Sequence, residues 1–224
     1  MLRAIRLSAL LIALALGGLW AAAWFDRAPG EGLADSFVRR VGGLLGADMP
    51  APSAGGVQMA QGVALGGAFS MVDHTGRAVT QEDFAGRHLL VYFGFTFCPD
   101  VCPTELGIMA AALDELGELG ERVTPVLVTV DPERDTPAAL AEYVGRFHPR
   151  MVGLTGTPEQ VAAIARAYRV FYAKVQRPEM SAYLMDHSSF IYLVGPDGRV
   201  RTLFRPNTPP EAVAAAVRGQ LRGA

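Results

Sequence analysis

Two cysteines, Cys98 and Cys102, are the residues of this chain whose type and spacing most clearly point to chemistry, and the chain has no others. The near-continuous apolar run Arg87–Phe95 before them predicts a strand that is buried on both faces. A helical pattern of apolar residues follows from Leu106, and Pro103 is tolerated in a helix only in its first turn. The sequence therefore predicts that both thiols lie at a strand-to-helix turn, where helix N–H groups favour a thiolate.

Two thiols four positions apart have two chemical uses. They can close a disulfide, because positions i and i+4 near a helix start can meet the distance limits of that bond. They can also hold one soft metal ion, because thiolates select Cu(I), zinc or iron–sulfur units. A pair of buried structural cysteines is the alternative, but the proline-rich turn favours exposure. Two cysteines are too few for a disulfide scaffold, so we interpret the pair as a functional site.

The elements that position the pair follow from hydrophobic periodicity and turn residues. Before and after the strand Arg87–Phe95, we expect a hairpin of Ala68–Val72 with Arg77–Thr80, a helix to about Leu119, a strand Val123–Val130, a helix Thr136–Phe147, a short strand Met151–Leu154, a helix from Thr157 to Tyr168, a strand Val170–Gln176, a hairpin of Ser189–Val194 with Arg199–Phe204, and a last helix from Pro209 to about Leu221. This order predicts an α/β fold, a thioredoxin-like sandwich with a mixed central sheet. The C-x-x-x-C spacing is one residue longer than the redox C-x-x-C motif, which leaves more room for a metal between the sulfurs.

Two thiolates rarely complete a metal site, so a histidine is the expected third ligand. His74 lies in a hairpin turn and His148 follows a helix, and we expect both to be exposed. His88 starts a strand, and its neighbours give no reason for a ligand role. His187 lies in a polar break before a buried strand, and in a thioredoxin-like fold that loop faces the cysteine turn. We therefore expect His187 to complete the site.

The N-terminus has the pattern of a membrane segment. Arg3 and Arg6 precede Leu7–Phe25, a run without a charged residue, which as a helix would be about 28 Å long and span a hydrocarbon core. The arginines before the run predict a single-pass anchor in the inner (cytoplasmic) membrane, with the C-terminal domain on the periplasmic side. A cleaved signal peptide ending near Ala21–Ala23 is the alternative. Both interpretations export the domain.

We divide the chain into three parts. Residues 1–25 are the anchor, or an uncleaved signal, and residues 26–64 are a flexible tether rich in Gly, Ala and Pro. Residues 65–224 are the thioredoxin-like domain. The net charge of −2 gives no indication of a nucleic-acid partner.

Three motifs together resemble the Sco/SenC family of membrane-anchored copper chaperones for cytochrome c oxidase. They are TFCPDVCPTEL, VDPERDTP and the DHS segment, and the resemblance covers residues 65–222. It implies a thioredoxin-like fold and copper held by Cys98, Cys102 and His187. It also implies delivery of copper to the binuclear copper site of an oxidase subunit, or maintenance of that site's cysteines in reduced form. Met185 is a departure, since many members carry valine there; core packing and a weak additional ligand are its two interpretations.

The chemistry of the ligand set agrees with copper. Thiolates suit Cu(I), and an imidazole helps to hold Cu(II), so one trigonal site can bind both states. Asp186 adjoins the histidine and could orient its ring or steer a partner. Asp131 follows a core strand on the same side of the sheet as the cysteines. Two roles are open for it: an outer-shell carboxylate of the metal site, or a cap for the turn at Pro132.

Two functions from different classes remain open. The first is a copper metallochaperone without catalytic turnover, and the second is an enzyme, a thiol–disulfide reductase acting on the oxidase subunit. The histidine distinguishes them, because dithiol exchange does not require it. An exported cysteine pair tends to oxidise, so we also expect a periplasmic thiol reductase as a partner.

Overall fold

The computed structural model describes residues 17, 18, 20–22, 24, 25, 36, 56–59, 65–176 and 181–222. Gly55–Ala224 is one compact unit and Met1–Ala54 is another. The predicted membrane segment Leu7–Phe25 lies largely outside the described residues. Among those that are described, no helix has both the length and the apolar character needed to cross a membrane.

A mixed sheet forms the centre of the domain. In the described residues it has the order β1-β10-β9-β4-β5-β6-β2-β3, in which β4 pairs in parallel with β5 and β5 in parallel with β6, and the remaining pairs are antiparallel. The strands are β1 (Gly56–Gln58), β2 (Ser70–Asp73), β3 (Ala78–Thr80), β4 (His88–Gly94), β5 (Val123–Thr129), β6 (Val152–Thr155), β9 (Ile191–Val194) and β10 (Val200–Phe204). Every residue of β4 and β5 is buried, as their apolar runs predict for strands covered on both faces.

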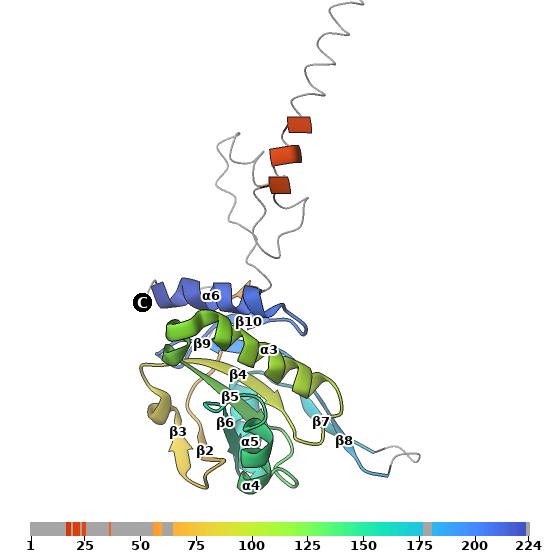
Figure 1. The fold of residues 1–224 in the computed structure, drawn as a ribbon. Coiled ribbons are helices and arrows are strands. Elements are labelled where there is room, and N and C mark those ends of the chain that lie inside the picture. The colour runs from red at the N-terminus through yellow and green to blue at the C-terminus, as the bar shows by residue number, and fades with distance from the viewer. Residues whose placement is uncertain are drawn as a thin grey trace, which may run out of the picture. The chain divides into compact units, whose positions relative to one another are not determined.

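Helices cover both faces of the sheet. They are α3 (Val101–Leu116), α4 (Pro137–Val144), α5 (Pro158–Ala167) and α6 (Pro210–Arg222), with two 3₁₀ segments at Gln81–Phe84 and Gly117–Arg122. α3 packs beside α6 (Figure 1). Successive residues of β4 face opposite sides: a Cβ at Gly94 would meet Cys102 at the start of α3, whereas the ring of Phe93 packs on Tyr168, directly after α5. The expected thioredoxin-like α/β sandwich with a mixed sheet is confirmed.

The helix starts agree with the sequence signals. Thr136 caps α4 by accepting a hydrogen bond from the backbone N–H of Ala139, and Pro137 is the first helical residue. Thr157 and Gln160 form a capping box at the start of α5. Hydroxyls at N-caps and prolines in the first turn satisfy or remove N–H groups that the helix leaves unpaired, which explains why these boundaries were predictable.

A second, two-stranded sheet carries the histidine. β7 (Tyr172–Val175) and β8 (Leu184–His187) pair antiparallel, with Tyr172 opposite His187, and Figure 1 shows them projecting from the body of the domain. The expectation that His187 lies on a loop is therefore wrong. β8 is four residues long and has one partner strand among the described residues, and four residues are too few to show a clear period in the sequence.

β1 is a second difference from the sequence analysis. It lies within the segment 26–64 that we assigned to the tether, yet it pairs with β10 along Gly56–Phe204, Val57–Leu203 and Gln58–Thr202. The sheet therefore begins before residue 65. Three residues next to a Gly- and Ala-rich stretch give no strand signal, and only the free edge of β10 makes a strand of them. The rest of the proposed domain division stays a prediction.

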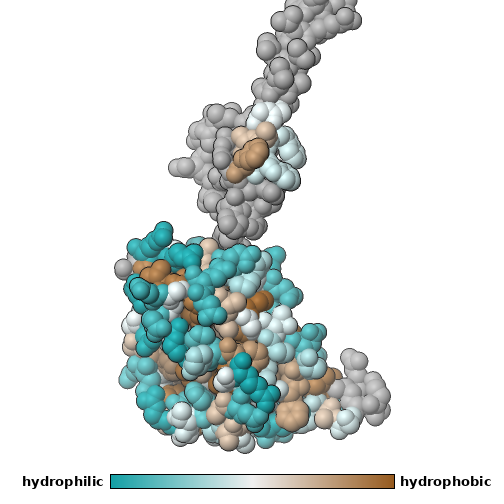
Figure 2. Space-filling view, viewed as in Figure 1, coloured by the Kyte–Doolittle hydropathy of each residue, from teal (hydrophilic) through white to brown (hydrophobic). Residues whose placement is uncertain are grey.

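The surface of the domain is mixed. Figure 2 shows hydrophilic residues surrounding smaller hydrophobic areas on the face in view. The described domain residues include four exposed large hydrophobics, namely Val57, Phe97, Phe171 and Phe190. Phe97 precedes Cys98, Phe190 follows the His187 segment, and the backbone carbonyl of Phe171 accepts a hydrogen bond from the N–H of Ser188. Exposed aromatic side chains are thus concentrated around the predicted site.

Candidate metal centre

The turn between β4 and α3 places the two cysteines in different environments. Cys98 is half-buried and Cys102, in the first turn of α3, is completely buried. The backbone N–H of Cys102 donates to the sulfur of Cys98 at 3.4 Å, so the predicted contact between a thiol and the helix N-terminus is present. The hydroxyl of Tyr92 lies 3.8 Å from the Cys102 sulfur.

Gly94 makes this close packing possible. A Cβ at this position would lie 2.9 Å from the Cys102 sulfur and 2.8 Å from the ring of Tyr92, both closer than non-bonded atoms tolerate. Any other residue at Gly94 would therefore displace the buried thiol or the tyrosine. The sequence analysis missed this requirement, because glycine at a strand end is also common for turn formation.

His187 approaches the cysteines from β8. Its Nε2 lies 3.5 Å from the sulfur of Cys102, and its Nδ1 lies 3.1 Å from the carbonyl oxygen of Ser188. The imidazole packs edge-on against the rings of Tyr92 and Phe95, with centroids 6.0 and 5.9 Å away. The contact of Nδ1 with a backbone carbonyl orients the ring so that Nε2 faces the thiols, which is how histidine ligands are commonly oriented.

The two sulfurs and the histidine nitrogen lie within 4.8 Å of one another. A trigonal ion with bonds of about 2.1–2.3 Å separates its ligands by roughly 3.6–4.0 Å, so small movements would bring all three atoms onto one ion. In the part of the chain that the structure describes, this is the group of histidine, cysteine and carboxylate side chains with that geometry. Cys98, Cys102 and His187 can therefore form a copper site.

The two thiols have opposite acidities. Hydrogen bonding from the Cys102 thiol, together with contacts from His187 and from the backbone N–H groups of Asp100 and Cys102, lowers the pKa of Cys98 to about 4 against the opposing effect of burial. Hydrogen bonding to Cys98 and burial raise the pKa of Cys102 well above its ordinary value. In the metal-free protein the pair therefore shares one proton, with the thiolate on Cys98 and the thiol on Cys102.

A buried carboxylate holds the segment that leads to the cysteines. Asp135 accepts hydrogen bonds from the backbone N–H of Thr96 at 3.1 Å, from the Thr96 hydroxyl at 2.6 Å and from the Thr129 hydroxyl at 2.6 Å. Burial nevertheless raises its pKa. Asp135 ties the turn after β5 to the turn after β4, and it belongs to the VDPERDTP motif, whose structural role the sequence analysis did not resolve.

The other candidate residues have different roles. Asp131 caps its turn through its carbonyl oxygen, which accepts from the N–H groups of Arg134 and Asp135, and its side chain bonds Arg134 and Tyr183. Asp186 is exposed, and strand alternation places it on the opposite side of β8 from His187. Met185 is buried in the hydrophobic core, which confirms its packing interpretation.

The remaining histidines lie away from the cysteines. His74 and His148 are half-buried rather than exposed as expected, because the Nδ1 of His74 accepts from the N–H of Gly153 and that of His148 from the N–H of Arg150. His88 is buried at the start of β4, at the other end of that strand from the site. Of the four histidines, the structure brings His187 to the thiols.

Comparisons with known proteins agree with this geometry. A model of the SCO1/SenC family matches residues 57–222. The human mitochondrial protein SCO1 homolog is 46% identical over 160 residues, which are 70% of this chain and 53% of the human protein, so the chain spans about half the length of that relative.

Two solved structures extend the likeness. Arabidopsis thaliana ScoI with copper bound is 41% identical, with a TM-score of 0.68 over 72% of this chain and 100% of that one. BsSco, described as a member of the Sco family of cytochrome c oxidase assembly proteins with a disulfide switch, is 26% identical, with a TM-score of 0.57 over 73% of this chain and 98% of that one. Both the bound copper and the disulfide switch belong to those proteins.

Proposed function

The chain belongs to the SCO1/SenC family, and from that premise we propose that it is a copper metallochaperone. It binds one copper ion through Cys98, Cys102 and His187 and delivers it to the binuclear copper site of a cytochrome c oxidase subunit. The observation that carries this proposal is the approach of two sulfurs and one imidazole nitrogen to within 4.8 Å of one another. Copper is cargo in this scheme, so the site must both hold the ion and release it.

The ligand set suits such a cargo. Thiolates favour Cu(I), and the imidazole adds a nitrogen ligand that Cu(II) accepts. Cys98 is half-buried and already a thiolate, so it can meet an incoming ion without first losing a proton. Cys102 is buried and protonated, so metal binding must displace its proton. The order that follows is capture by Cys98, and then closure onto Cys102 and His187.

The direct test is metal analysis of the purified full-length chain after reduction and anaerobic copper addition. We expect one copper per chain, and we expect Cys98→Ser and Cys102→Ser to lose tight binding, because a hydroxyl is a hard and mostly protonated ligand. His148→Ala is the matched control, since this histidine lies outside the site. Full copper occupancy in Cys98→Ser would refute the site.

A second function rests on the acidities of the two thiols. As a thiol–disulfide reductase, the Cys98 thiolate would attack one sulfur of the recipient's disulfide and release the other sulfur as a thiolate. Cys102, after losing its proton, would then attack Cys98 and release the second recipient thiol. Two electrons pass to the recipient, and a Cys98–Cys102 disulfide remains, which a periplasmic thiol reductase must reduce again. The low pKa of a half-buried Cys98 favours this chemistry.

His187→Ala separates the two functions in cells. A chaperone needs the histidine as a ligand, so the variant should fail to assemble oxidase at low copper, whereas a reductase should keep that activity. Cys98→Ser should fail in both cases, and His148→Ala should behave as the wild type. If His187→Ala assembles oxidase normally while Cys98→Ser does not, the chaperone proposal is wrong and the reductase takes its place.

The proposed location is the inner membrane, with the domain on the periplasmic side. The charge pattern around Leu7–Phe25 supports it. A reporter fused after Ala224 should be active only outside the cytoplasm, and the protein should stay with membranes after a high-salt wash. Release at a smaller mass would indicate cleavage of the N-terminal segment instead.

A further inference from the structure

The two halves of the candidate centre come from segments that no shared strand pairing joins. Cys98 and Cys102 follow β4 of the central sheet, whereas His187 ends β8, which pairs with β7 in a separate sheet of the described structure. The C-terminal end of β8 is tied to the central sheet through the chain, because only three residues separate His187 from β9, which pairs with β4. The start of β8 at Leu184 has no pairing with the central sheet in the described structure, so its position relative to the cysteine turn depends on side chains that bridge the two segments.

Arg134 contacts both halves. Its side chain pairs with Asp131 in its own turn, and its Nη1 donates to the carbonyl oxygen of Tyr183 at 3.0 Å, one residue before β8 begins. The guanidinium carbon lies 3.7 Å from the centroid of the Tyr183 ring. The same carbon lies 4.6 Å from the ring centroid of Phe97, the residue before Cys98.

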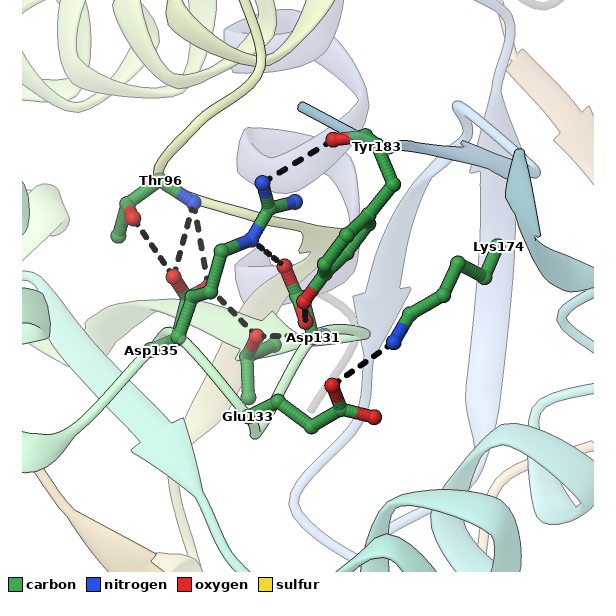
Figure 3. A network of polar contacts seen from close by, with 8 residues as sticks. Thr96, Asp131, Glu133, Asp135, Lys174 and Tyr183 are labelled. Carbon is green, nitrogen blue, oxygen red and sulfur yellow. Dashed lines mark hydrogen bonds and ion pairs between the residues drawn. The ribbon is translucent and has the colours of Figure 1, made fainter. Parts of the chain in front are cut away.

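Tyr183 is held at its other end as well. Its hydroxyl donates to the Asp131 carboxylate at 2.8 Å, and Figure 3 shows its ring beside that carboxylate, with Asp135 and Thr96 on the left of the view. Lys174 on β7 lies 4.0 Å over the same ring and pairs with Glu133 at 2.7 Å. Each of the three residues Arg134, Asp131 and Tyr183 thus contacts the other two. At the surface, Lys174 contacts the Tyr183 ring and pairs with Glu133.

Burial distinguishes the Arg134–Asp131 pair from the outer Lys174–Glu133 pair. The side chains of Arg134 and Asp131 are 16% and 2% exposed, whereas those of Lys174 and Glu133 are 44% and 62% exposed. Exposed ion pairs contribute little, because solvent screens them, while a partly desolvated cation over an aromatic face contributes more. Among the described residues the Nη2 of Arg134 is buried without a hydrogen-bond partner, so the contacts of the guanidinium with Asp131 and with the aromatic rings must offset the cost of that unpaired donor.

We propose that Arg134 is a positioning residue that joins the two halves of the metal centre and sets the distance from His187 to the thiols. Arg134 holds Tyr183 and so fixes the start of β8. Its contact with Phe97 then keeps the start of β8 at a set position relative to the cysteine turn. A copper ion then meets three ligands rather than two. This inference rests on the proposed function, because it assigns Arg134 a role in the same site.

The oxidation states of copper distinguish this role from a general effect on stability. Two thiolates can hold Cu(I) in a linear geometry, whereas Cu(II) depends on the imidazole nitrogen. Loosening β8 should therefore weaken Cu(II) binding about 10-fold or more, the usual effect of losing a residue that orients a ligand. Cu(I) binding should change little. The visible Cu(II)–thiolate absorption should shift or fade in the same variants.

The variants use the full-length chain and aim at each contact separately. Tyr183→Leu removes the aromatic ring but keeps the Arg134–Asp131 pair, so it avoids leaving a buried carboxylate unpaired. Tyr183→Phe keeps the ring and should retain near-wild-type Cu(II) binding. Arg134→Met should behave as Tyr183→Leu does. Arg134→Lys should not rescue it, because an ammonium lacks the planar stacking face.

Arg146→Met is the matched control for Arg134→Met, because Arg146 forms an exposed ion pair with Glu142 on α4. It should leave both copper affinities unchanged. Hydrogen–deuterium exchange of the β7–β8 amides in the metal-free chain adds a readout that needs no copper. Exchange there should be faster in Tyr183→Leu and in Arg134→Met than in wild type or Arg146→Met.

Wild-type Cu(II) binding in both Tyr183→Leu and Arg134→Met would overturn the positioning role. A fall of the same size for Cu(I) and Cu(II) would also overturn it, because it would reflect a damaged fold. Failure of the wild-type chain to bind any copper would instead refute the proposed function. The exchange rates of the β7–β8 amides would then decide separately whether Arg134 holds the strand.

Discussion

At the scale of single residues, the two cysteines have the same side chain but differ in acidity and in exposure to solvent. Cys98 receives hydrogen bonds at the surface end of the turn, while Cys102 lies beneath Tyr92 and is inaccessible to solvent. Their spacing in the sequence does not tell which of the two is the thiolate. The burial of Cys102, its hydrogen bond to Cys98 and the backbone N–H groups at the helix start together decide that Cys98 carries the charge.

Thiol alkylation tests this assignment. Because the pKa of Cys98 is about 4 rather than the ordinary 9.0, its thiolate fraction is already about 90% at pH 5 and rises little above that. The rate of Cys98 alkylation by iodoacetamide in the reduced, metal-free chain should therefore be nearly flat from pH 5.5 to 7.5, and Cys102 should remain unmodified. Mass spectrometry of the labelled peptides measures both. The chain unfolded in guanidinium is the control, and a tenfold rise per pH unit in the folded chain would contradict the prediction.

Glu105 is a buried acid that the sequence analysis missed, one helical turn after Cys102. Its Oε1 accepts from the backbone N–H of Asn207 at 2.7 Å, whereas its Oε2 is buried and has no hydrogen-bond partner in the described part of the chain. Burial raises its pKa above the ordinary 4.5. The folded protein therefore holds this proton at pH values where the unfolded chain has released it. The carboxyl group favours folding at low pH, and that contribution is lost as pH rises from about 4.5 through the raised pKa.

Glu105→Gln should remove this titration while keeping an acceptor oxygen for Asn207. The free energy of unfolding of the variant, relative to wild type, should increase as pH rises from 4 to 7. The slope has an upper limit of about 1.4 kcal/mol per pH unit for one proton. Urea unfolding at several pH values gives the comparison. A difference that does not change with pH would contradict the prediction.

At the scale of elements, the metal centre depends on how two turns are tied together. The turn after β5 supplies Asp135, and the turn after β4 supplies Thr96, two residues before Cys98. β4 and β5 are parallel neighbours, so their carboxyl ends meet at one edge of the sheet, where functional groups of open α/β sheets gather. This arrangement is why a motif far from the cysteines in sequence contributes to their position.

Asp135→Ala should destabilise the domain by about 2–4 kcal/mol, because it leaves the donors of the half-buried Thr96 and the buried Thr129 unsatisfied. Asp135→Asn keeps one acceptor oxygen and should cost less. Asp197→Ala is the control, since Asp197 is exposed and its ion pair with Arg201 is partly solvated; it should change stability by less than about 1 kcal/mol. Urea unfolding measures all three. Equal losses for Asp135→Ala and Asp197→Ala would show that the buried carboxylate does not tie the turns.

At the scale of the whole molecule, the N-terminal boundary of the domain depends on which strand pairs with the edge of the central sheet. β1 covers the edge of β10, and the carbonyl oxygen of Leu65 accepts from the N–H of Val200 at 3.0 Å. Leu65 is also buried in the core. Leu65 thus belongs to the domain, and β1, which precedes the predicted start at 65, also contributes to the stability of the sheet.

Two fragments compare these boundaries. A fragment of residues 55–224 should unfold with a free energy higher by about 1–3 kcal/mol than a fragment of residues 65–224, because the shorter one loses the backbone hydrogen bonds of β1. The shorter fragment should also self-associate more readily through the exposed edge of β10. Urea unfolding and sedimentation measure the two effects. Identical midpoints would show that β1 is dispensable and that the domain begins near residue 65.

The sequence by itself determined what depends on near neighbours in the chain. Apolar runs identified β4 and β5, hydroxyl and proline signals located the starts of α4 and α5, and the strand-to-helix turn placed the cysteines. These features arise from backbone hydrogen bonding and side-chain burial within a few residues, so their signals are local. The motifs also resembled one family, and the family match agrees.

Only the tertiary structure decided what depends on contacts between distant segments. β1 and β8 are strands only because β10 and β7 offer them edges. The proton distribution of the thiols depends on burial under β4 and β8, and the contacts of Arg134 span residues 97 to 183. Such distances, pKa shifts and bridging contacts are set by how the chain packs in three dimensions, and no period or spacing along the sequence encodes them.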